Sequence, residues 1–398
     1  MQPFQSKVGL KAKRFIVDVV LERWIPLSRL ESYLVFWARL VCRFRRPFII
    51  GVTGSVGKST TTALIAAVLS HRDARQIVGP VGCTLENMND DVGLAATLLG
   101  YKRFLILPWS YPGRLAMLCR MPFRALRLVL GPYPKVMVLE CGVGSTSDMR
   151  RLVTMAPPNI AVVTRIGAAH LEMMKTLDGV VQEKSVLVRA ASPTGLVILG
   201  QGHEYVSQLE QAARAPVVKV SGQGVELSQN VARAVCQHMG VPEDVVSSAL
   251  KEFKSPQGRL NRLELAGMTV IDDSYNANPM SMELGLDTLA KTTKPPHRRL
   301  AVLGFMAELG AEGPRYHEDV GAYARSRTDI LIGVGELSKL YKPDHWFDSS
   351  EACADAIENL LRIDDCVLVK GSHSARMELV VKSLRRIAER RMTQQVQA

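Results

Sequence analysis

The sequence lacks paired cysteine motifs and any apolar run long enough to cross a bilayer. Its seven cysteines are scattered, none forms a CxxC pair, and no cysteine–histidine spacing suits zinc. This usage favours a reducing compartment, so we expect a cytoplasmic protein. A membrane-spanning helix needs about 20 consecutive apolar residues. No such run occurs, and no secretory leader with a cleavage site is recognisable.

Acidic residues are outnumbered by basic ones. The 398 residues contain 50 Lys and Arg against 38 Asp and Glu, which gives a formal net charge of +12. This balance suits an anionic partner such as a nucleotide, a phosphosugar, a nucleic acid or a membrane headgroup, and charge alone does not choose among them. The length predicts two to three domains.

Two segments combine basic and aromatic side chains. Residues 1–46 carry ten Lys and Arg against three Asp and Glu, and residues 101–135 carry seven basic residues and no acidic one. The first segment is expected to form two helical pieces broken near Pro26, either as a hairpin packed on the core or as a membrane-surface helix. The second, an insertion, is either a packed loop or a lid, partner surface or membrane contact.

Short apolar runs alternate with helix-like stretches from residue 47 to 257. Strands are predicted at 48–53, 136–140, 160–164 and 196–199, and helices at 64–69, 178–190 and 230–239. This alternation predicts an α/β fold of the P-loop type, a parallel central sheet with helices on both faces. Residues 258–398, with strands at 268–271, 300–304, 330–334 and 367–370, predict a smaller Rossmann-like α/β domain.

A glycine-rich turn, TGSVGKST, lies between the first predicted strand and a helix. Such a turn points several backbone N–H groups at one place, and the helix dipole adds positive potential there. Lys58 adds a charge and Ser59 a hydroxyl that can bind Mg²⁺, so the phosphates of ATP are the expected ligand. The strict Walker glycine is replaced by Val52, and Gly54 lies two residues later. The predicted loop residues are Thr53, Gly54, Ser55, Gly57, Lys58, Ser59 and Thr60.

Further stretches follow in a fixed order. They are LENMNDDVGLAATLL (85–99), VMVLECGVGSTSDM (136–149), PPNIAVVTRIGAAHLEMMKTLDGVVQEKSVLV (157–188), GRLNRLEL (258–265), VIDDSYNANPMSM (270–282), LAVLGFMAELG (300–310) and VLVKGSHSARMELVV (367–381). Together with the loop they resemble the Mur ligases, most closely the branch that adds D-alanyl-D-alanine, and their folylpolyglutamate synthetase relatives. The resemblance covers about residues 48 to 384.

The resemblance implies an ATP-dependent, ADP-forming ligase that joins an acid to an amino acid or dipeptide through an acyl phosphate. It implies two Mg²⁺ ions, with Ser59 and Glu140 as ligands of one. His170 and a carbamylated Lys184 would serve the other. Carbamylation would turn a cationic amine into an anionic oxygen ligand, which Mg²⁺ prefers. Lys58 would bridge the β- and γ-phosphates. The resemblance thus assigns catalysis to Lys58, Glu140, His170 and Lys184.

Other matching positions imply nucleotide contacts. Asn230 resembles the family's adenine-side asparagine, although a simple helix N-cap explains it as well. Arg259 is expected at the phosphates, Asp273 at the ribose or metal-bound waters, and Asn276 and Asn278 at the nucleotide or product. For the YNANP stretch a turn held by asparagine side chains is the alternative. Lys370, Ser372 and Arg376 are expected at the carboxylate of the amine substrate.

The sequence departs from the family in three places. Only 46 residues precede the first predicted strand, too few for the family's UDP-sugar-binding domain. Arg165 replaces the asparagine of TNIG, and LGQGHEYV, with His203 and Glu204, replaces an LN.DD stretch. The acid is therefore open: a cell-wall precursor, lipid-linked or otherwise altered, or another acid in a specialised or polyglutamate-type pathway. A non-catalytic nucleotide-binding homologue is a further alternative, and nucleic acid is not expected as a partner.

Overall fold

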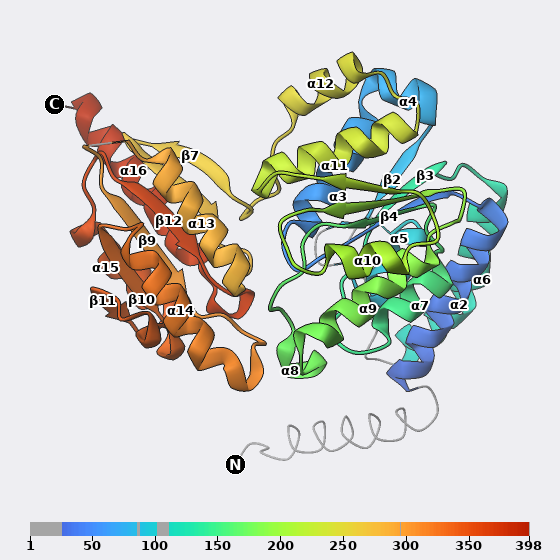
Figure 1. The fold of residues 1–398 in the computed structure, drawn as a ribbon, viewed down its shortest axis with the longest axis horizontal. Helices are drawn as coiled ribbons and strands as arrows, with labels where there is room; N and C mark the ends of the chain where they lie inside the picture. Colours follow the sequence, from blue (N-terminus) through green and yellow to red (C-terminus); the bar gives the residue numbers. More distant parts are fainter. Residues whose placement is uncertain (1–25, 86–87, 102–110, 295, 398) are drawn as a thin grey trace, which may run out of the picture.

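The computed structural model describes residues 26–85, 88–101, 111–294 and 296–397. Expectations that fall on residues 1–25 and 102–110 lie outside this part. The described chain contains two six-stranded sheets, one on either side of residue 257 (Figure 1). All seven cysteines are free. Among the described helices, none combines the length and the apolar character that crossing a membrane requires.

The first sheet is parallel throughout, in the order β2-β3-β1-β4-β5-β6. The structure confirms all four predicted strands, as β1 (Phe48–Thr53), β3 (Val136–Glu140), β4 (Ile160–Val163) and β5 (Leu196–Gly200). Sequence reasoning missed the edge strands β2 (Val81–Cys83) and β6 (Val217–Val220). The central strands are continuous apolar runs because helices cover both faces.

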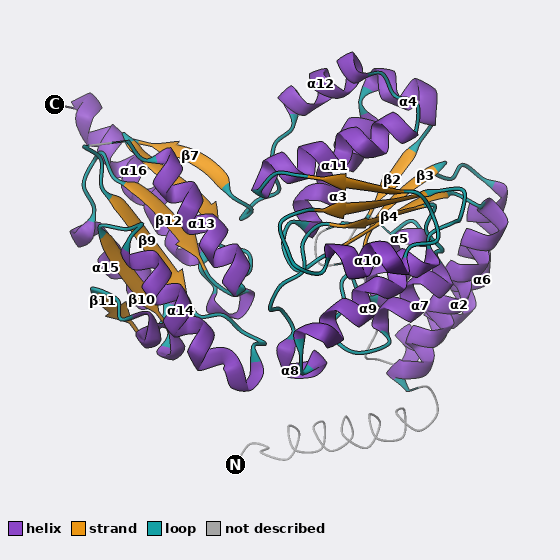
Figure 2. Ribbon diagram, in the orientation of Figure 1, coloured by secondary structure: helices purple, strands orange, loops and turns teal. Residues whose placement is uncertain are grey.

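Two layers of helices cover this sheet (Figure 2). One face of the sheet packs against α3 (Lys58–Ser70), α4 (Arg72–Val78), α11 (Gly224–His238) and α12 (Glu243–Glu252), which form the first group of helices. The second group comprises α2 (Leu27–Arg45), α5 (Asp91–Leu98), α6 (Tyr111–Leu130), α7 (Asp148–Met155), α8 (Leu171–Met174), α9 (Leu177–Ala190) and α10 (Val206–Ala212). The predicted helix at 230–239 therefore begins six residues earlier, at Gly224.

The second sheet has the order β11-β10-β9-β12-β8-β7. Its edge strand β7 (Asn261–Leu265) runs antiparallel to β8 (Met268–Asp273). The other strands are parallel: β9 (Arg299–Gly304), β10 (Ile330–Val334), β11 (His345–Phe347) and β12 (Cys366–Lys370). Helices α13 (Pro279–Thr292) and α14 (Gly313–Arg325) cover one face, and α15 (Ser350–Ala356) and α16 (Glu378–Gln397) the other. Short 3₁₀ turns, η1 (Gly310–Glu312), η2 (Glu336–Tyr341), η3 (Ile357–Leu360) and η4 (His373–Ala375), complete this half.

Helix α2 begins directly after Pro26 and packs on the first half of the protein. Its buried side chains, Leu30, Leu34, Ala38 and Val41, are fully inaccessible to solvent. Residues 27–45 thus form a helix that packs on the core, as the first of the two expectations for residues 1–46 has it. The insertion differs from expectation, because residues 111–130 form a 20-residue helix rather than a packed loop. Helices α2 and α6 lie side by side at the edge far from the second sheet (Figure 1).

A proline inside α6 explains one contact between these two helices. Pro122 has no N–H, so the carbonyl of Leu118 loses its helical donor. The hydroxyl of Tyr33 on α2 donates to this carbonyl at 2.9 Å. Farther along, the guanidinium of Arg45 donates to the carbonyl of Val129 at 3.1 Å. The two helices therefore run parallel, with one bond near the middle of α6 and one near the C-terminal end of both helices.

Tyr33→Phe should lower the free energy of unfolding by about 1 kcal/mol, because the Leu118 carbonyl loses its donor while partly buried. In a Pro122→Ala background the new N–H of residue 122 supplies that donor, so the same change should cost much less. Urea unfolding of the four proteins of this cycle measures the difference. Equal losses in both backgrounds would contradict the assignment.

Candidate active site

A cleft of about 710 Å³ lies between the two halves, at the carboxyl ends of strands β1, β3, β4 and β8. In open α/β sheets ligands bind at this edge. The glycine-rich loop forms one wall, and the other comes from the segments around β7, β8 and α13. Of the predicted site residues, those that line the cleft are Ser55, Gly57, Lys58, Ser59, Thr60, Glu140, His170, Arg259, Asp273, Asn276, Asn278 and Lys370.

The glycine-rich loop is tied to the end of β4. The Ser55 N–H donates to the carbonyl of Arg165 at 2.6 Å, and the Thr164 hydroxyl donates to the carbonyl of Val56 at 2.6 Å. Gly54 has φ +149°, and a side chain there would collide with the Thr164 hydroxyl. Thr53 lies beneath the loop, where its hydroxyl donates to the carbonyl of Cys141 at 2.8 Å. Thr53 and Gly54 shape the loop without lining the cleft.

Two lysines share one acceptor in this loop. The Nζ atoms of Lys58 and Lys184 lie 2.9 and 3.1 Å from the carbonyl oxygen of Gly54. Lys184 is fully buried and does not line the cleft. Burial lowers the pKa of Lys184 well below its usual value, and the charge of Lys58 lowers it further. Desolvation also lowers the pKa of Lys58, which Glu140 opposes. The loop thus holds one amine at the cleft and a second one beneath it.

Glu140 and His170 lie on the same side of the cleft, each held by a neighbour. The Asn89 amide donates to Glu140 Oε1 at 2.9 Å. His170 Nδ1 lies 2.6 Å from Glu308 Oε2, which joins the two halves. The bond to His170 lowers the pKa of the Glu308 carboxyl. Sequence reasoning named neither Asn89 nor Glu308, although both lie in stretches that carry the family resemblance.

Further contacts cross the cleft beside the loop. The guanidinium of Arg259 donates to Ser59 Oγ at 3.0 Å and stacks over the ring of Tyr275, 3.8 Å from its centroid. The Asn278 amide donates to the carbonyl of Ser55 at 3.0 Å. Asn278 is also the N-cap of α13, with a capping box to Ser281. Within the YNANP stretch, Asn278 therefore both stabilises the start of α13 and makes a contact across the cleft.

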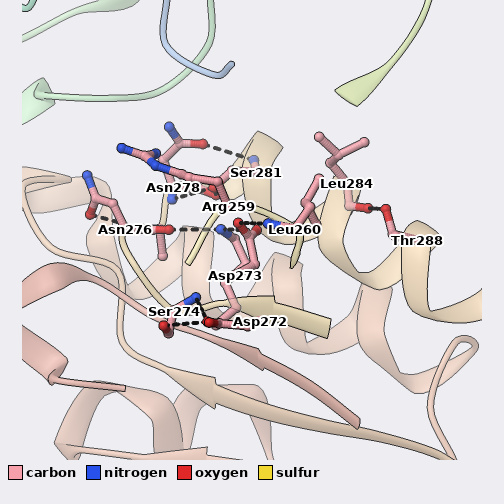
Figure 3. A network of polar contacts seen from close by, with 12 residues as sticks. Arg259, Leu260, Asp272, Asp273, Ser274, Asn276, Asn278, Ser281, Leu284 and Thr288 are labelled. Carbon is pink, nitrogen blue, oxygen red and sulfur yellow. Dashed lines mark hydrogen bonds and ion pairs between the residues drawn. The ribbon is translucent and has the colours of Figure 1, made fainter. Parts of the chain in front are cut away.

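Asp273 organises the wall opposite the loop (Figure 3). It accepts the Leu260 N–H at 3.1 Å and the amine of Lys370 at 2.6 Å. The same amine donates to the carbonyl of Asn276 at 2.8 Å, and Lys370 is only 2% exposed. Lys370 therefore fixes the strand ends that carry Asp273 and Asn276. Neither Ser372 nor Arg376 lines the cleft.

Asn230 is placed differently from expectation. It lies inside α11, which begins at Gly224, so the N-cap alternative is wrong. Its amide donates to the carbonyl of Ser221 at 2.9 Å, and it does not line the cleft. The sequence suggested a helix start here because Gly224 and Glu226 in the first turn of α11 are untypical of a buried helix, although Leu227 and Val231 already follow helical spacing. Asn230 instead anchors the loop that precedes this helix.

Two of the three departures from the family, Arg165 and the stretch at 200–205, meet behind the loop. The guanidinium of Arg165 lines the cleft and donates to the carbonyl of Gly222 at 3.0 Å. Burial lowers the pKa of His203, and the charge of Arg165 lowers it further. Arg165 therefore ties the end of β4 to the loop after β6, and the substituted stretch at 200–205 lies next to it.

The donor atoms around the loop suit a hard cation held together with phosphate. No cluster of three or more His, Cys, Asp and Glu side chains that could hold a metal exists in the described part of the chain. Mg²⁺ does not need one, because it binds through one or two protein oxygens plus phosphates and water. The hydroxyl of Ser59 and the carboxylate of Glu140 fit that requirement. Lys184, as a free amine, does not.

Two family models match the chain. The Mur ligase middle domain matches residues 126–260, and the Mur ligase, glutamate ligase domain matches residues 258–373. Among curated proteins, the chain is 27% identical to the UDP-N-acetylmuramoyl-tripeptide–D-alanyl-D-alanine ligase of Synechocystis sp., covering 89% of this chain and 79% of the relative. The enzyme of the same name from Escherichia coli is 26% identical over 84% of this chain and 76% of its own length.

Solved structures show the same fold. MurF ligase from Thermotoga maritima, in complex with ADP, has a TM-score of 0.73 at 21% identity and covers 91% of this chain and 84% of that one. FolC from E. coli, in complex with DHPP and ADP, has a TM-score of 0.60 at 18% identity, covering 91% and 98%. The two domain models match consecutive parts of the chain, and residues of both parts line the cleft. This chain therefore belongs to the Mur ligase family.

Proposed function

We propose that the protein is an ATP-dependent, ADP-forming ligase that joins a carboxylate to an amine. One observation carries the proposal: the glycine-rich loop, with Lys58 above it and Lys184 beneath it, shares a cleft with Glu140 and His170. The relatives named above are ligases, and family membership supports the same reaction here. The proposal keeps three parts: residues 1–46, a central ATPase domain at 47–257 with the insertion 101–135, and a C-terminal domain at 258–398.

The reaction needs activation because a carboxylate does not react with an amine unaided. A carboxylate oxygen attacks the γ-phosphorus of ATP, ADP leaves, and an acyl phosphate forms. The amine then attacks the acyl carbon, phosphate leaves, and the amine nitrogen loses its proton. Negative charge on the phosphoryl oxygens grows during the first step, so fixed donors around it lower the barrier.

The chain supplies these donors from both halves. In the proposal the loop from Gly54 to Thr60 and the amine of Lys58 bind the phosphates, through loop N–H groups other than that of Ser55, which donates to the Arg165 carbonyl. The guanidinium of Arg259, now on Ser59, lies close enough to the loop to reach them. Asp273 and Asn276, fixed by Lys370, would contact the ribose side. For Asn230 the proposal keeps the adenine side, where its amide oxygen or second N–H would make the contact while the first N–H stays on the Ser221 carbonyl.

Two Mg²⁺ ions are part of the proposal. Ser59 and Glu140 would hold one, and His170 with a carbamylated Lys184 the other. Bound there, Mg²⁺ would neutralise charge on the transferring phosphoryl group. The lowered pKa of Lys184 supports carbamylation, because only the neutral amine reacts with CO₂. His170 is kept in place by Glu308 and would exchange that partner for the metal.

The substrates are proposed to be small molecules. The relatives' names point to a D-alanyl-D-alanine-type amine and a cell-wall-precursor-like acid. A polyglutamate-type elongation is the second candidate, because FolC shares the fold over 91% of this chain. We place the reaction in the cytoplasm and include a peripheral membrane contact through 1–46 and 101–135. Such a contact would suit a lipid-linked acid.

ADP release, screened over pairs of acids and amines with mass detection of the amide, should show turnover for at least one pair. Muramyl-peptide acids with D-alanyl-D-alanine test the first candidate, and pteroyl acids with glutamate test the second. Lys58→Ala should lower turnover at least about 100-fold, because it removes a cation from the phosphates. Lys219→Ala is the control, because this lysine is exposed on the edge strand β6 and does not line the cleft. Tight ATP binding without ADP release for any pair would favour a non-catalytic homologue.

Lys184→Met should abolish turnover and lower the melting temperature only slightly, because the Gly54 carbonyl keeps its bond to Lys58 when it loses the one to Lys184. Methionine keeps the length and apolar stem of the buried side chain while removing the amine. Wild-type enzyme stripped of CO₂ should lose activity and regain it on adding bicarbonate. Full activity of the Met variant would refute the metal-side role of Lys184, and a large fall in melting temperature would indicate a structural role instead.

A further inference from the structure

Helix α6 carries an apolar stripe on its solvent side. Phe123 and Leu130 are 75% and 77% exposed, and Leu126 and Leu115 are 55% and 45% exposed. With the exposed Cys119 they recur at helical spacing. At about 100° per residue, the five side chains fall within an arc of about 80°. The stripe therefore runs along almost the whole length of the helix.

Packing within the described part of the chain does not explain this stripe. The opposite side of α6 is already used, because Met121 and Ala125 are buried in the core beneath it. A surface helix normally turns polar residues to the solvent. Here the solvent side is apolar as well, and such patches mark interaction sites. The adjoining helix α2 exposes Phe36 and Phe44, at 55% and 64%.

The stripe has a positively charged border. Arg120 and Arg127 are both exposed. At about 100° per residue around the helix axis, they lie about 40–60° beyond the edge of the stripe. Helix α2 adds the exposed Arg39 and Arg43, and Arg46 follows it. Helix α6 has no acidic residue, and α2 has only Glu31, which is half-buried. The two helices thus combine exposed apolar side chains with exposed arginines.

The helix is held rigidly in this position. The Tyr33 hydroxyl fixes its middle to α2, and the Arg45 guanidinium fixes its C-terminal end. Arg124 Nε donates to the carbonyl of Leu99 at 2.7 Å, while its guanidinium stacks over the ring of Tyr101. A fixed stripe inserts into a surface without first paying to order itself.

We propose that the α6 stripe and its arginine border bind the surface of an anionic lipid bilayer. Apolar side chains bordered by basic ones are the features of an interfacial helix. A second copy of the chain fits less well, because it would place arginines opposite arginines. The face lies at the edge of the molecule away from the second half, so the cleft between the halves stays open (Figure 1). The inference rests on the membrane part of the proposed function and not on its ligase chemistry.

Cys119 supplies a probe within the stripe. It is the exposed cysteine of the seven, so an NBD fluorophore on the full chain reports the polarity around α6. With vesicles of equal parts phosphatidylglycerol and phosphatidylcholine we expect the protein to float and its NBD emission to shift to the blue. With phosphatidylcholine alone neither should occur. Raising the salt concentration should weaken binding.

Two pairs of matched variants separate the apolar and the charged contributions. Phe123→Ser/Leu130→Ser should lower vesicle binding at least about tenfold, against an Ile77→Ser/Ile363→Ser control away from α6 at apolar positions that are also more than half exposed, 51% and 57%. Arg120→Glu/Arg127→Glu should lower it at least about tenfold, against Lys382→Glu/Arg385→Glu with the same change in net charge. All these positions are exposed, so the fold should tolerate the changes.

Four outcomes would overturn the proposal. They are no flotation with anionic vesicles, flotation without an NBD shift, test variants that bind like their controls, and a dimer in sedimentation that Phe123→Ser dissociates. Flotation without a shift would place the contact elsewhere on the chain. ADP release measured without vesicles gives an independent reading, so failure of the ligase proposal would not be mistaken for failure of this one.

Discussion

The carbonyl of Gly54 is the point on which the cleft depends. It accepts two lysine amines, one from the helix that follows the loop and one from α9, a helix of the opposite layer. The loop is thereby fixed to both helical layers of the sheet. The end of β4 supplies the rest of its support, through the Arg165 carbonyl and the Thr164 hydroxyl. A side chain at position 54 would break this arrangement, since it would displace that hydroxyl.

The sequence predicted what local patterns decide. Central strands such as β1 and β3 are unbroken apolar runs because both their faces are covered, and that is visible in the letters. Edge strands lack such an apolar run, because β6 has two exposed residues of four and β2 has only three residues. Helix α6 was missed because Pro122 argues against a helix, and only the structure shows that Tyr33 compensates for it.

Part of the candidate site could be predicted because its residues lie in local sequence motifs. Ser59, Glu140, His170 and Arg259 lie in recognisable motifs, and the fold brings them to one cleft. Their partners could not be read from one chain. Glu308 meets His170 across 138 residues of sequence, and Lys370 holds Asp273 across 97. Asn230 was misplaced because Gly224 and Glu226 are untypical of a helix interior, although Leu227 and Val231 already follow helical spacing in α11.

The contacts across the cleft also bear on the order of events in a reaction cycle. Ser59 and His170 already have protein partners, Arg259 and Glu308, on the opposite half. A ligand that claims either atom must therefore compete with the bond that draws the two halves together. Ligand binding and separation of the two halves would then be thermodynamically coupled. A molecule bound between Arg259 and Ser59 would keep the two halves apart.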